Sequence, residues 1–553
     1  MGKSKKSLRK VLSLVTAGAL ALAVGGYSIL FATAATETDD AAPVAAAPVA
    51  AEKAAAGPTK ALGTSEGTDH VVFGVISDTH VTAVNFTTQA RLAEAFKFFS
   101  GTSTDPNAAK LDAVVVAGDL SDSGSSSDLN TWKAIKDVNL SPDVKLIAAM
   151  GNHEANQWAN FEKATGDLAN AVYDVNGYTF ITVSPGEGTL NTYNMRATVF
   201  NTGAYRYIVK WLEEQLKAAE AKSPDKPIFV FFHHPIRDTF YVSHEWYGSG
   251  LEEVFQAHPR AVTFAGHIHS PNNNPLSIWQ DGGFTAINTV TLKYFELETG
   301  MTYGSVPPNS GNAAQGLVLD VTDNQVTVYN YDFISKSWID QTWTFTTADN
   351  LADADLPYTT AVRTAQAGKP EFAAGAKLTV NKAGLNSVRM DFDQAFIPAN
   401  SVGDIVHSYV CDFINQATGK TDVTYKAFSE YYFLPMPKTI GADIDGLKSG
   451  TEYELQVHAV DAYGLVSDQY LSATFTLDVA TLPGANLATT EFPGSPAEEP
   501  TEVATAVDEV SSIAVAITPD TGDSSRTVLL LVAFAGLAAF GVAVVVRQKS
   551  RRA

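Results

Sequence analysis

Short apolar runs alternate with amphipathic stretches between about residues 70 and 345 of the chain. The apolar runs have the length of buried strands, and the amphipathic stretches place apolar residues at helical spacing. The predicted strands are residues 71–77, 111–117, 145–150, 228–232 and 261–265, and the predicted helices are residues 87–99, 130–138 and 205–221. Strands that alternate with helices favour a parallel sheet with a ligand site at the carboxyl ends of the strands.

After about residue 282 the pattern predicts strands alone. The last strands of this first part cover residues 316–321, 325–331 and 337–345. Residues 370–480 again show only strand patterns, clearest over residues 377–381, 387–392, 405–414 and 452–460. Their spacing is typical of a β-sandwich, so we expect a separate all-β domain here, joined to the first part by a linker over residues 348–369.

Both ends of the chain carry an apolar run beside basic residues. Basic residues precede an apolar run that extends to about residue 30, and Ala32-Thr33-Ala34 supplies a small-x-small cleavage pattern. Residues 1–34 are therefore predicted to be a signal peptide, with an uncleaved anchor as the alternative because the run almost spans a bilayer. Residues 527–546 are uncharged and long enough for a transmembrane helix, and the basic residues 547–553 predict a cytoplasmic tail.

Two segments have a composition that cannot build a core. Residues 35–67 and 481–526 are rich in Ala, Pro, Glu and Thr and poor in large apolar side chains. We expect the first to be a disordered linker and the second to be an acidic stalk.

Charge and cysteine content exclude several classes of partner and metal site. The chain has 553 residues, a formal net charge of -22 and one Cys. The acidic charge argues against nucleic acid as a partner, since phosphate backbones are bound by Lys and Arg. Cys411 alone cannot form an internal disulfide or a thiolate zinc cluster, and its place in a predicted strand suggests a buried small apolar side chain. A metal site in this chain must use His, Asp, Asn and Glu.

Five polar blocks each follow a predicted strand. They are Asp78-Thr79-His80, Gly118-Asp119, Gly151-Asn152-His153-Glu154, His233-His234-Pro235 and Gly266-His267-Ile268-His269. Loops after adjacent parallel strands gather at one edge of a sheet, so we expect blocks scattered along the chain to meet at one place.

The spacing within the blocks suits metal binding. Residues i and i+2 of an extended segment point to the same side, so Asp78 and His80 can hold one ion, and His267 and His269 can face one cavity. Glycine precedes the polar residue in three blocks, where it permits sharp turns and close backbone approach. Ligands without thiolate suit Mn, Fe or Zn, and a carboxylate such as Asp119 can bridge two ions that clamp a phosphate and generate hydroxide. Taken singly, each block can also be interpreted as an ordinary turn or as a packed His. For the five blocks together, the alternative is a structural metal site.

At these residues the sequence resembles the calcineurin-like metallophosphoesterase family. The blocks match its D-x-H, GD, GNH(D/E), H-x-P and GHxH signatures in order. The resemblance implies an α/β fold, a double β-sheet sandwich flanked by helices, over residues 68–347. It also implies two divalent or trivalent metal ions, one held by Asp78, His80, His269 and Asp119 and the other by Asn152, His233, His267 and Asp119.

The resemblance further implies the catalytic roles. A hydroxide that bridges the ions would attack phosphorus, while His153 would contact the phosphate and protonate the leaving oxygen. Asp119 and His153 are thus the expected catalytic residues, and Asn152 and His153 are expected to contact substrate. His234 and Arg237 are weaker candidates for substrate binding, and packing or a solvated loop is their alternative role.

Two further resemblances concern the rest of the chain. The alternating residues around Tyr453 resemble the E–F corner and F strand of fibronectin type III domains, in which Tyr453 would be the corner tyrosine. Thr518-Pro519-Asp520-Thr521-Gly522 resembles the Leu-Pro-x-Thr-Gly sorting signal of Gram-positive wall-anchored proteins. That resemblance implies sortase processing and linkage to peptidoglycan. Thr518 stands in place of Leu, so a plain membrane anchor is the alternative.

The expected protein is an extracellular, surface-anchored phosphoric-ester hydrolase of a Gram-positive bacterium. Its acidic surface favours phosphomonoesters or phosphodiesters of small molecules, such as nucleotides, cyclic nucleotides or glycerophosphodiesters. The alternative is a surface adhesin in which the fibronectin-like domain has the main role. Metal identity, natural substrate and oligomeric state do not follow from the sequence.

Overall fold

The computed structural model describes residues 57–479 apart from residues 66, 68, 155–156, 187, 190–191, 194–204, 246–247, 351–355, 400 and 402. The predicted signal peptide over residues 1–34 lies outside the described residues, as do the predicted stalk, transmembrane helix and tail over residues 481–553. Within the described part of the chain, no helix is long and apolar enough to cross a membrane.

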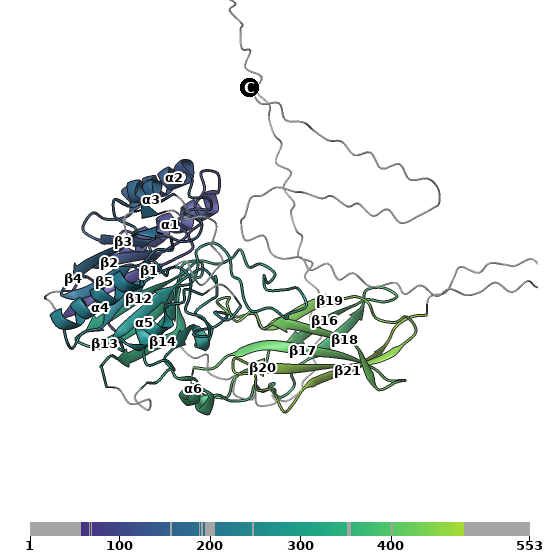
Figure 1. The fold of residues 1–553 in the computed structure, drawn as a ribbon. Coiled ribbons are helices and arrows are strands. Elements are labelled where there is room, and N and C mark those ends of the chain that lie inside the picture. The colour runs from purple at the N-terminus through teal and green to yellow at the C-terminus, as the bar shows by residue number, and fades with distance from the viewer. Residues whose placement is uncertain are drawn as a thin grey trace, which may run out of the picture. The chain divides into compact units, whose positions relative to one another are not determined.

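The first part of the chain contains two six-stranded mixed sheets (Figure 1). In the first sheet β1, β2 and β3 run parallel, and β12, β13 and β14 extend it by antiparallel pairing beside β1. Its order is β14 (Ser337–Thr346), β13 (Gln325–Asp332), β12 (Gln315–Thr322), β1 (His70–Ile76), β2 (Ala113–Ala117) and β3 (Lys145–Ala149).

The second sheet has a parallel centre between two antiparallel edges. Strands β5, β8, β9 and β11 are parallel, whereas β4 and β10 pair antiparallel with their neighbours. Its order is β10 (Ile278–Trp279), β11 (Thr285–Asn288), β9 (Ala261–Ala265), β8 (Ile228–Phe231), β5 (Tyr178–Thr182) and β4 (Ala171–Val175). A short ladder joins β6 (Gly188–Thr189) to β7 (Thr192–Tyr193).

The two sheets face each other across an aromatic core. Phe73 of the first sheet lies with its ring centroid 4.8 Å from that of Phe180 and 5.0 Å from that of Phe229, both in the second sheet. Fully burying such side chains stabilises the fold by about 1.5–3 kcal/mol each. This core fixes the relative position of the two sheets and therefore of the loops at their carboxyl ends.

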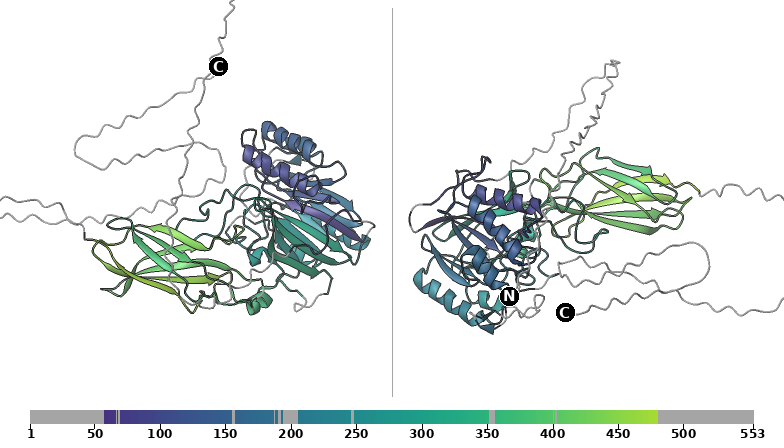
Figure 2. Two further views of the ribbon diagram at one scale, coloured as in Figure 1. Left: turned by 180° about the vertical axis from the view of Figure 1, so that it is seen from behind. Right: turned by 90° about the horizontal axis from the view of Figure 1, so that it is seen from above.

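Helices cover the outer face of each sheet, as Figure 2 shows for α1, α2 and α3 together beside the first sheet. These three are α1 (Phe86–Phe99), α2 (Ser126–Asn139) and α3 (Trp158–Thr165), while α4 (Val209–Lys222) and α5 (Glu252–Gln256) pack on the second sheet. Two of them begin one to four residues before the predicted start because a polar side chain caps each N-terminus. Asn85 accepts from the amides of Thr87 and Thr88, and Ser125 accepts from that of Asp128.

The fold class expected from the sequence is confirmed: an α/β part with two facing sheets flanked by helices, followed by an all-β part. The alternating pattern alone favoured one parallel sheet, whereas the strands divide between two mixed sheets. The edge strand β4 and the buried β5 were not predicted, although Asn176-Gly177 between them is a sequence signal for a β-hairpin.

The all-β part is built from two antiparallel sheets. One has the order β15 (Leu378–Lys382), β16 (Val388–Asp393) and β19 (Thr439–Ile444), and the other β18 (Lys420–Phe428), β17 (Val406–Asn415), β20 (Glu452–Asp461) and β21 (Leu471–Thr476). The predicted corner residue Tyr453 accepts a hydrogen bond from the amide of Lys448 at 3.0 Å. Cys411 is buried in β17, as expected. The helix α6 (Thr360–Gln366) precedes this sandwich, and the 3-10 turn η1 (Pro275–Ser277) precedes β10.

Candidate metal centre

The five polar blocks do meet, at the carboxyl ends of strands from both sheets. Asp78, Asp119 and Asn152 follow β1, β2 and β3 of the first sheet, whereas His233 and His267 follow β8 and β9 of the second. The site therefore lies where the two sheets face each other, so its geometry depends on the core between them.

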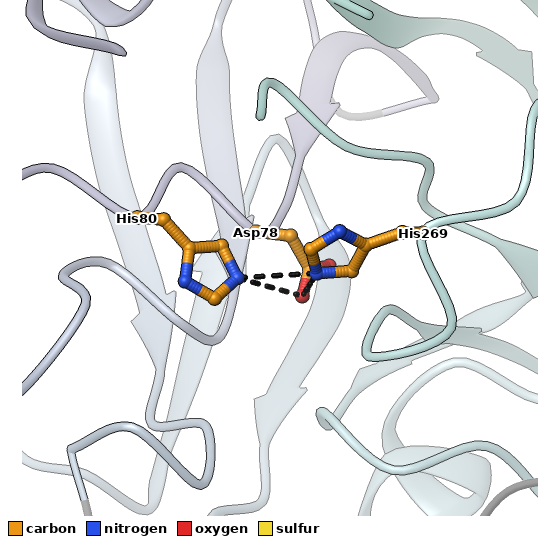
Figure 3. A group of neighbouring side chains, drawn as sticks. All are labelled: Asp78, His80 and His269. Carbon is orange, nitrogen blue, oxygen red and sulfur yellow. Dashed lines mark hydrogen bonds and ion pairs between the residues drawn. The ribbon is translucent and has the colours of Figure 1, made fainter. Parts of the chain in front are cut away.

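Asp78, His80 and His269 form one compact group (Figure 3). The Asp78 carboxylate lies 3.1 Å from Nε2 of His269 and 3.8 Å from Nε2 of His80. The two histidine Nε2 atoms are 3.1 Å apart. All three side chains are buried and point to a common centre.

Asp119, His233 and His267 form a second group. Asp119 Oδ2 is 3.1 Å from Nε2 of His233 and 3.7 Å from Nε2 of His80, so this carboxylate faces both groups at once. It also lies 3.7 Å from Nε2 of His153. A carboxylate in this position can serve two ions, as a bridging ligand must.

The backbone is left-handed at five of the predicted ligands. Their φ angles are 49° at Asp78, 42° at His80, 49° at Asp119, 74° at His267 and 52° at His269. The segments are thus twisted loops and not the extended strands that the i, i+2 argument assumed. Non-glycine residues seldom adopt this conformation, and it is held in place here by the surrounding structure, as is common at functional sites.

Two glycines are required by the close approach of the loops. Gly118 has a φ of 96°, and a Cβ atom there would lie 2.4 Å from Nδ1 of His233. At Gly151 a Cβ atom would lie 2.0 Å from Oδ1 of Asp119. The expectation that these glycines permit sharp turns and close contacts is confirmed.

Oxygen acceptors fix the orientation of the histidines. The Nδ1–H group of His233 donates to the Ala117 carbonyl at 3.0 Å, and that of His269 donates to the Tyr294 carbonyl at 3.1 Å. The Nδ1–H group of His80 donates to the Asp122 carboxylate at 2.9 Å. Each of these histidines therefore turns Nε2 to the centre, as metal-ligating histidines do.

These atoms fit metal ions. The lone pairs on Nε2 of His80 and His269 face each other at 3.1 Å, where they repel unless a cation or proton lies between them. Oδ1 of Asn152 and Nε2 of His267 are buried without a hydrogen-bond partner among the described residues. Buried polar atoms are otherwise almost always paired, so these orphans indicate where a cation would bind.

The pKa shifts of the ligand candidates also agree with metal binding. Burial by itself would raise the pKa of Asp78 and of Asp119, but nearby imidazoles hold both pKa values well below the ordinary range. For His233, burial lowers the pKa and the Asp119 and Asp78 carboxylates raise it, with a net rise to about 9. A metal ion would displace this proton, because only neutral imidazole binds metal. Burial lowers the pKa of His267, which is therefore ready as a neutral ligand.

His153 lies beside the two groups and forms a third group of possible ligands with His80 and Asp119. Its amide donates to Asp119 Oδ1 at 2.9 Å, and its Nδ1–H donates to the Asp122 carbonyl at 2.6 Å. The ring therefore presents Nε2 toward the site, where it is partly open to solvent. Burial lowers the pKa of His153, but the Asp119 charge, the bond to the Asp122 carbonyl and the nearby Glu154 and Asp122 charges together outweigh this and raise the pKa.

The two weaker candidates for substrate binding, His234 and Arg237, lie in different surroundings. The ring of His234 is buried with its centroid 4.5 Å from that of His267, and its Nδ1 accepts from the Tyr205 hydroxyl at 3.1 Å. Arg237 is largely exposed and lies 4.0 Å from Asp238, which agrees better with a solvated loop. Its role in substrate binding stays a prediction.

The structure adds residues that the sequence did not single out. Lys293 donates to the Asp122 carboxylate that holds His80, and Tyr294 supplies the carbonyl that holds His269. Glu154, which belongs to the third block but had no predicted role, accepts from the amides of Ser121 and Gly151 and so joins the loop after β2 to the third block. No sequence signal could have shown these contacts, since nearly all join positions that are far apart in the chain.

Residues 71–271 match the family model of the calcineurin-like phosphoesterases. This part of the chain is a calcineurin-like phosphoesterase domain. The matched range includes all five polar blocks, so the chain carries the domain of a metal-dependent phosphoesterase. No curated protein matches the chain.

Several solved structures are similar in part. The purple acid phosphatase PPD1 from yellow lupin (Lupinus luteus) seeds is 13% identical with a TM-score of 0.35, and the alignment covers 53% of this chain and 57% of that one. A predicted phosphoesterase from Streptococcus pneumoniae is 13% identical with a TM-score of 0.25, over 50% of this chain and 98% of that one. The FN5 domain of Drosophila Lar is 15% identical with a TM-score of 0.14, over 20% of this chain and 97% of that one. We draw no functional conclusion from likenesses of this size.

Proposed function

We propose that the chain is an exported, surface-anchored hydrolase of phosphate esters that works with two metal ions. The observation that carries this proposal is the position of Asp119, whose carboxylate faces the Asp78, His80 and His269 group on one side and His233 on the other. A structural site for a single ion would not need a carboxylate placed between two ligand groups.

The ligand roles follow from the two groups. One ion would be held by Asp78, His80, His269 and Asp119, and the other by Asn152, His233, His267 and Asp119. When bound, such ions neutralise phosphate charge and lower the pKa of water, which supplies the nucleophile. The chain's own residues place these ligands on two rigid sheets and hold each Nε2 toward the centre.

His153 is the residue that we propose to give a proton to the leaving oxygen. Its Nδ1–H is tied to the Asp122 carbonyl, so Nε2 is the ring atom that can reach a substrate. The Asp119 charge favours its protonated form, as a general acid requires. Asn152 and His153 together would contact the phosphate, with His234 and Arg237 as further candidates.

The substrates that we propose are small phosphomonoesters or phosphodiesters, such as nucleotides, cyclic nucleotides or glycerophosphodiesters. A net charge of -22 repels long polyanions, while two metal ions create a local positive field that attracts a single phosphate. Nucleic acids are not expected as partners.

The test compares hydrolysis of p-nitrophenyl phosphate and bis-p-nitrophenyl phosphate by the Mn²⁺-loaded chain. Turnover of one or both is expected, and the ratio of the two rates divides monoesterase from diesterase activity. Asp119→Ala should remove activity and most of the bound Mn²⁺, whereas Asp238→Ala, an exposed carboxylate on a nearby loop, should change neither. Absence of turnover in a chain that demonstrably binds metal would refute the proposal.

Surface anchoring is proposed from residues outside the described part of the chain. The signal-like segment 1–34, the sorting-like motif 518–522 and the apolar run 527–546 support export followed by attachment to the wall or membrane of a Gram-positive bacterium. Mass analysis of the mature C-terminus separates the two attachments: cleavage after Thr521 means sortase and peptidoglycan linkage, and an intact tail means a membrane anchor.

We further propose that the sandwich is a fibronectin type III-like domain. The contact between Tyr453 and the Lys448 amide, five residues upstream, supports this because the corner tyrosine of such folds bonds back to the preceding backbone.

A further inference from the structure

A long loop, residues 289–314, leads from the metal centre to the β-sandwich. It joins the end of β11 to the start of β12 and contains no helix or strand. We call it the clasp loop. Loops of this length are normally mobile unless something holds them, so the contacts that hold it are informative.

Near its start the clasp loop contacts both the ring and the backbone of the metal-ligand candidate His269. The Tyr294 carbonyl accepts the Nδ1–H of His269 at 3.1 Å, and the Glu296 amide donates to the His269 carbonyl at 3.2 Å. The Tyr294 ring also lies 4.4 Å from the His269 ring. Residues 294 and 296 thus set both the backbone and the ring of this ligand.

The residue between them packs against a loop of the sandwich. Phe295 is fully buried, and its ring centroid lies 5.6 Å from that of Tyr432, in the segment that follows β18. Tyr432 is itself fully buried and belongs to the same apolar core as Phe295 and the outer face of the second sheet. The sandwich therefore packs directly behind the segment that holds His269.

Hydrogen bonds to strand β18 hold the loop further along. The Thr302 amide donates to the Lys426 carbonyl at 3.0 Å, and the Lys426 amide donates to the Thr302 hydroxyl at 2.8 Å. The Phe428 amide donates to the Tyr303 hydroxyl at 2.8 Å. These bonds use the free edge of β18, so the loop also protects an exposed strand edge.

We propose that the sandwich is a working part of the metal centre: through the clasp loop it positions His269, with Tyr432 as the positioning residue. This inference rests on the proposed metal-dependent function. It assigns the sandwich a role that neither a spacer nor an independent adhesive domain would have. Partners that orient a metal-ligating histidine are worth about 10–100-fold in metal affinity or activity, so release of the clasp loop should be measurable at the metal.

The test uses the full chain and three tyrosine variants. Tyr432→Ala removes the ring behind Phe295. Tyr432→Phe keeps the ring and loses only a buried hydroxyl that has no hydrogen-bond partner among the described residues. Tyr470→Ala is the matched control, because Tyr470 is half exposed and its ring packs against His458 within the sandwich.

Three quantities are measured: the affinity for Mn²⁺ by titration, the hydrogen exchange of residues 293–304 and the hydrolysis of p-nitrophenyl esters. Tyr432→Ala should weaken binding of one Mn²⁺ about tenfold and speed exchange in the loop, with a parallel loss of kcat. Tyr432→Phe should restore all three to the wild-type values, and Tyr470→Ala should change none. If Tyr432→Ala does not fold, Thr302→Val removes the acceptor for the Lys426 amide and should produce the same changes to a smaller degree.

Two results would overturn the proposal. One is an exchange rate in residues 293–304 that Tyr432→Ala leaves unchanged. The other is faster exchange with unchanged Mn²⁺ affinity, which would mean that the loop is held but does not position His269. Failure of the proposed function is distinguishable, since it would show in the wild-type chain as absent Mn²⁺ binding or absent turnover before any variant is compared.

Discussion

Tyr205 holds the loop of His233 through its hydroxyl group. The oxygen accepts from the backbone amides of His233 and His234, each at 3.2 Å, and the hydrogen is donated to Nδ1 of His234 at 3.1 Å. Burial raises the pKa of Tyr205, so the hydroxyl stays protonated and can make all three bonds. Tyr205→Phe removes this oxygen and leaves the ring in place, so it creates no large cavity.

The cost of this substitution follows from the two amides that it leaves without a partner. A buried N–H group that loses its acceptor costs about 1–3 kcal/mol. Two of them, in a loop that can shift slightly to regain part of the bonding, should lower the free energy of unfolding by about 2–4 kcal/mol. The same shift moves His233 and should weaken Mn²⁺ binding about tenfold or more, as loss of a ligand's supporting contacts does.

Urea denaturation of the metal-free chain measures the first effect, and Mn²⁺ titration measures the second. Tyr432→Phe is the control, since it also removes the hydroxyl of a fully buried tyrosine, but one without a hydrogen-bond partner among the described residues. It should change the free energy of unfolding by less than about 0.5 kcal/mol. If both phenylalanine variants behave like the wild type, Tyr205 does not support the His233 loop and the reasoning fails.

Three further predictions concern the site, the sandwich and the metal. Gly151→Ala places a Cβ atom 2.0 Å from Asp119 Oδ1, so Mn²⁺ affinity should fall at least about tenfold in a chain with unchanged circular dichroism; wild-type affinity would contradict this. Burial and the Asp461 charge raise the pKa of Asp404 to about 7, so its folded form keeps a proton that the unfolded chain loses near pH 4. The contribution of Asp404 to stability should therefore decline as pH rises from about 4 to 7, and Asp404→Asn should remove that contribution from the curve of unfolding free energy against pH; an unchanged slope would exclude the carboxyl as a source of the decline. Removal of metal by a chelator should lower the Tm, and Mn²⁺ at about 100 times its Kd should restore about 2.7 kcal/mol for each ion bound; an unchanged Tm would mean that the folded chain binds no metal.

Much of the candidate site could be predicted because its signal is local. Each block follows its own strand, and glycines such as Gly118 and Gly151 stand where the close approach of another loop requires them. The left-handed backbone at Asp78 and His80 could not be predicted, because no single residue type enforces it. It results from loops packed between two sheets, where His80 bonds to the backbone of Asp119.

The sequence by itself determined the chemistry: which residues can bind metal, that each follows a buried strand, and that a second all-β part follows. Those features depend on residue type and on spacing over a few positions. Only the tertiary structure decided that the strands divide between two sheets, that Tyr205 and Tyr294 hold ligand loops, and that Tyr432 of the sandwich packs against Phe295 of the clasp loop. The most distant of these contacts joins segments that are more than a hundred residues apart in the chain. These contacts form when apolar surfaces that are distant in the sequence pack together and exclude water. A local sequence pattern shows that a surface is apolar, but it does not show which other surface will cover it.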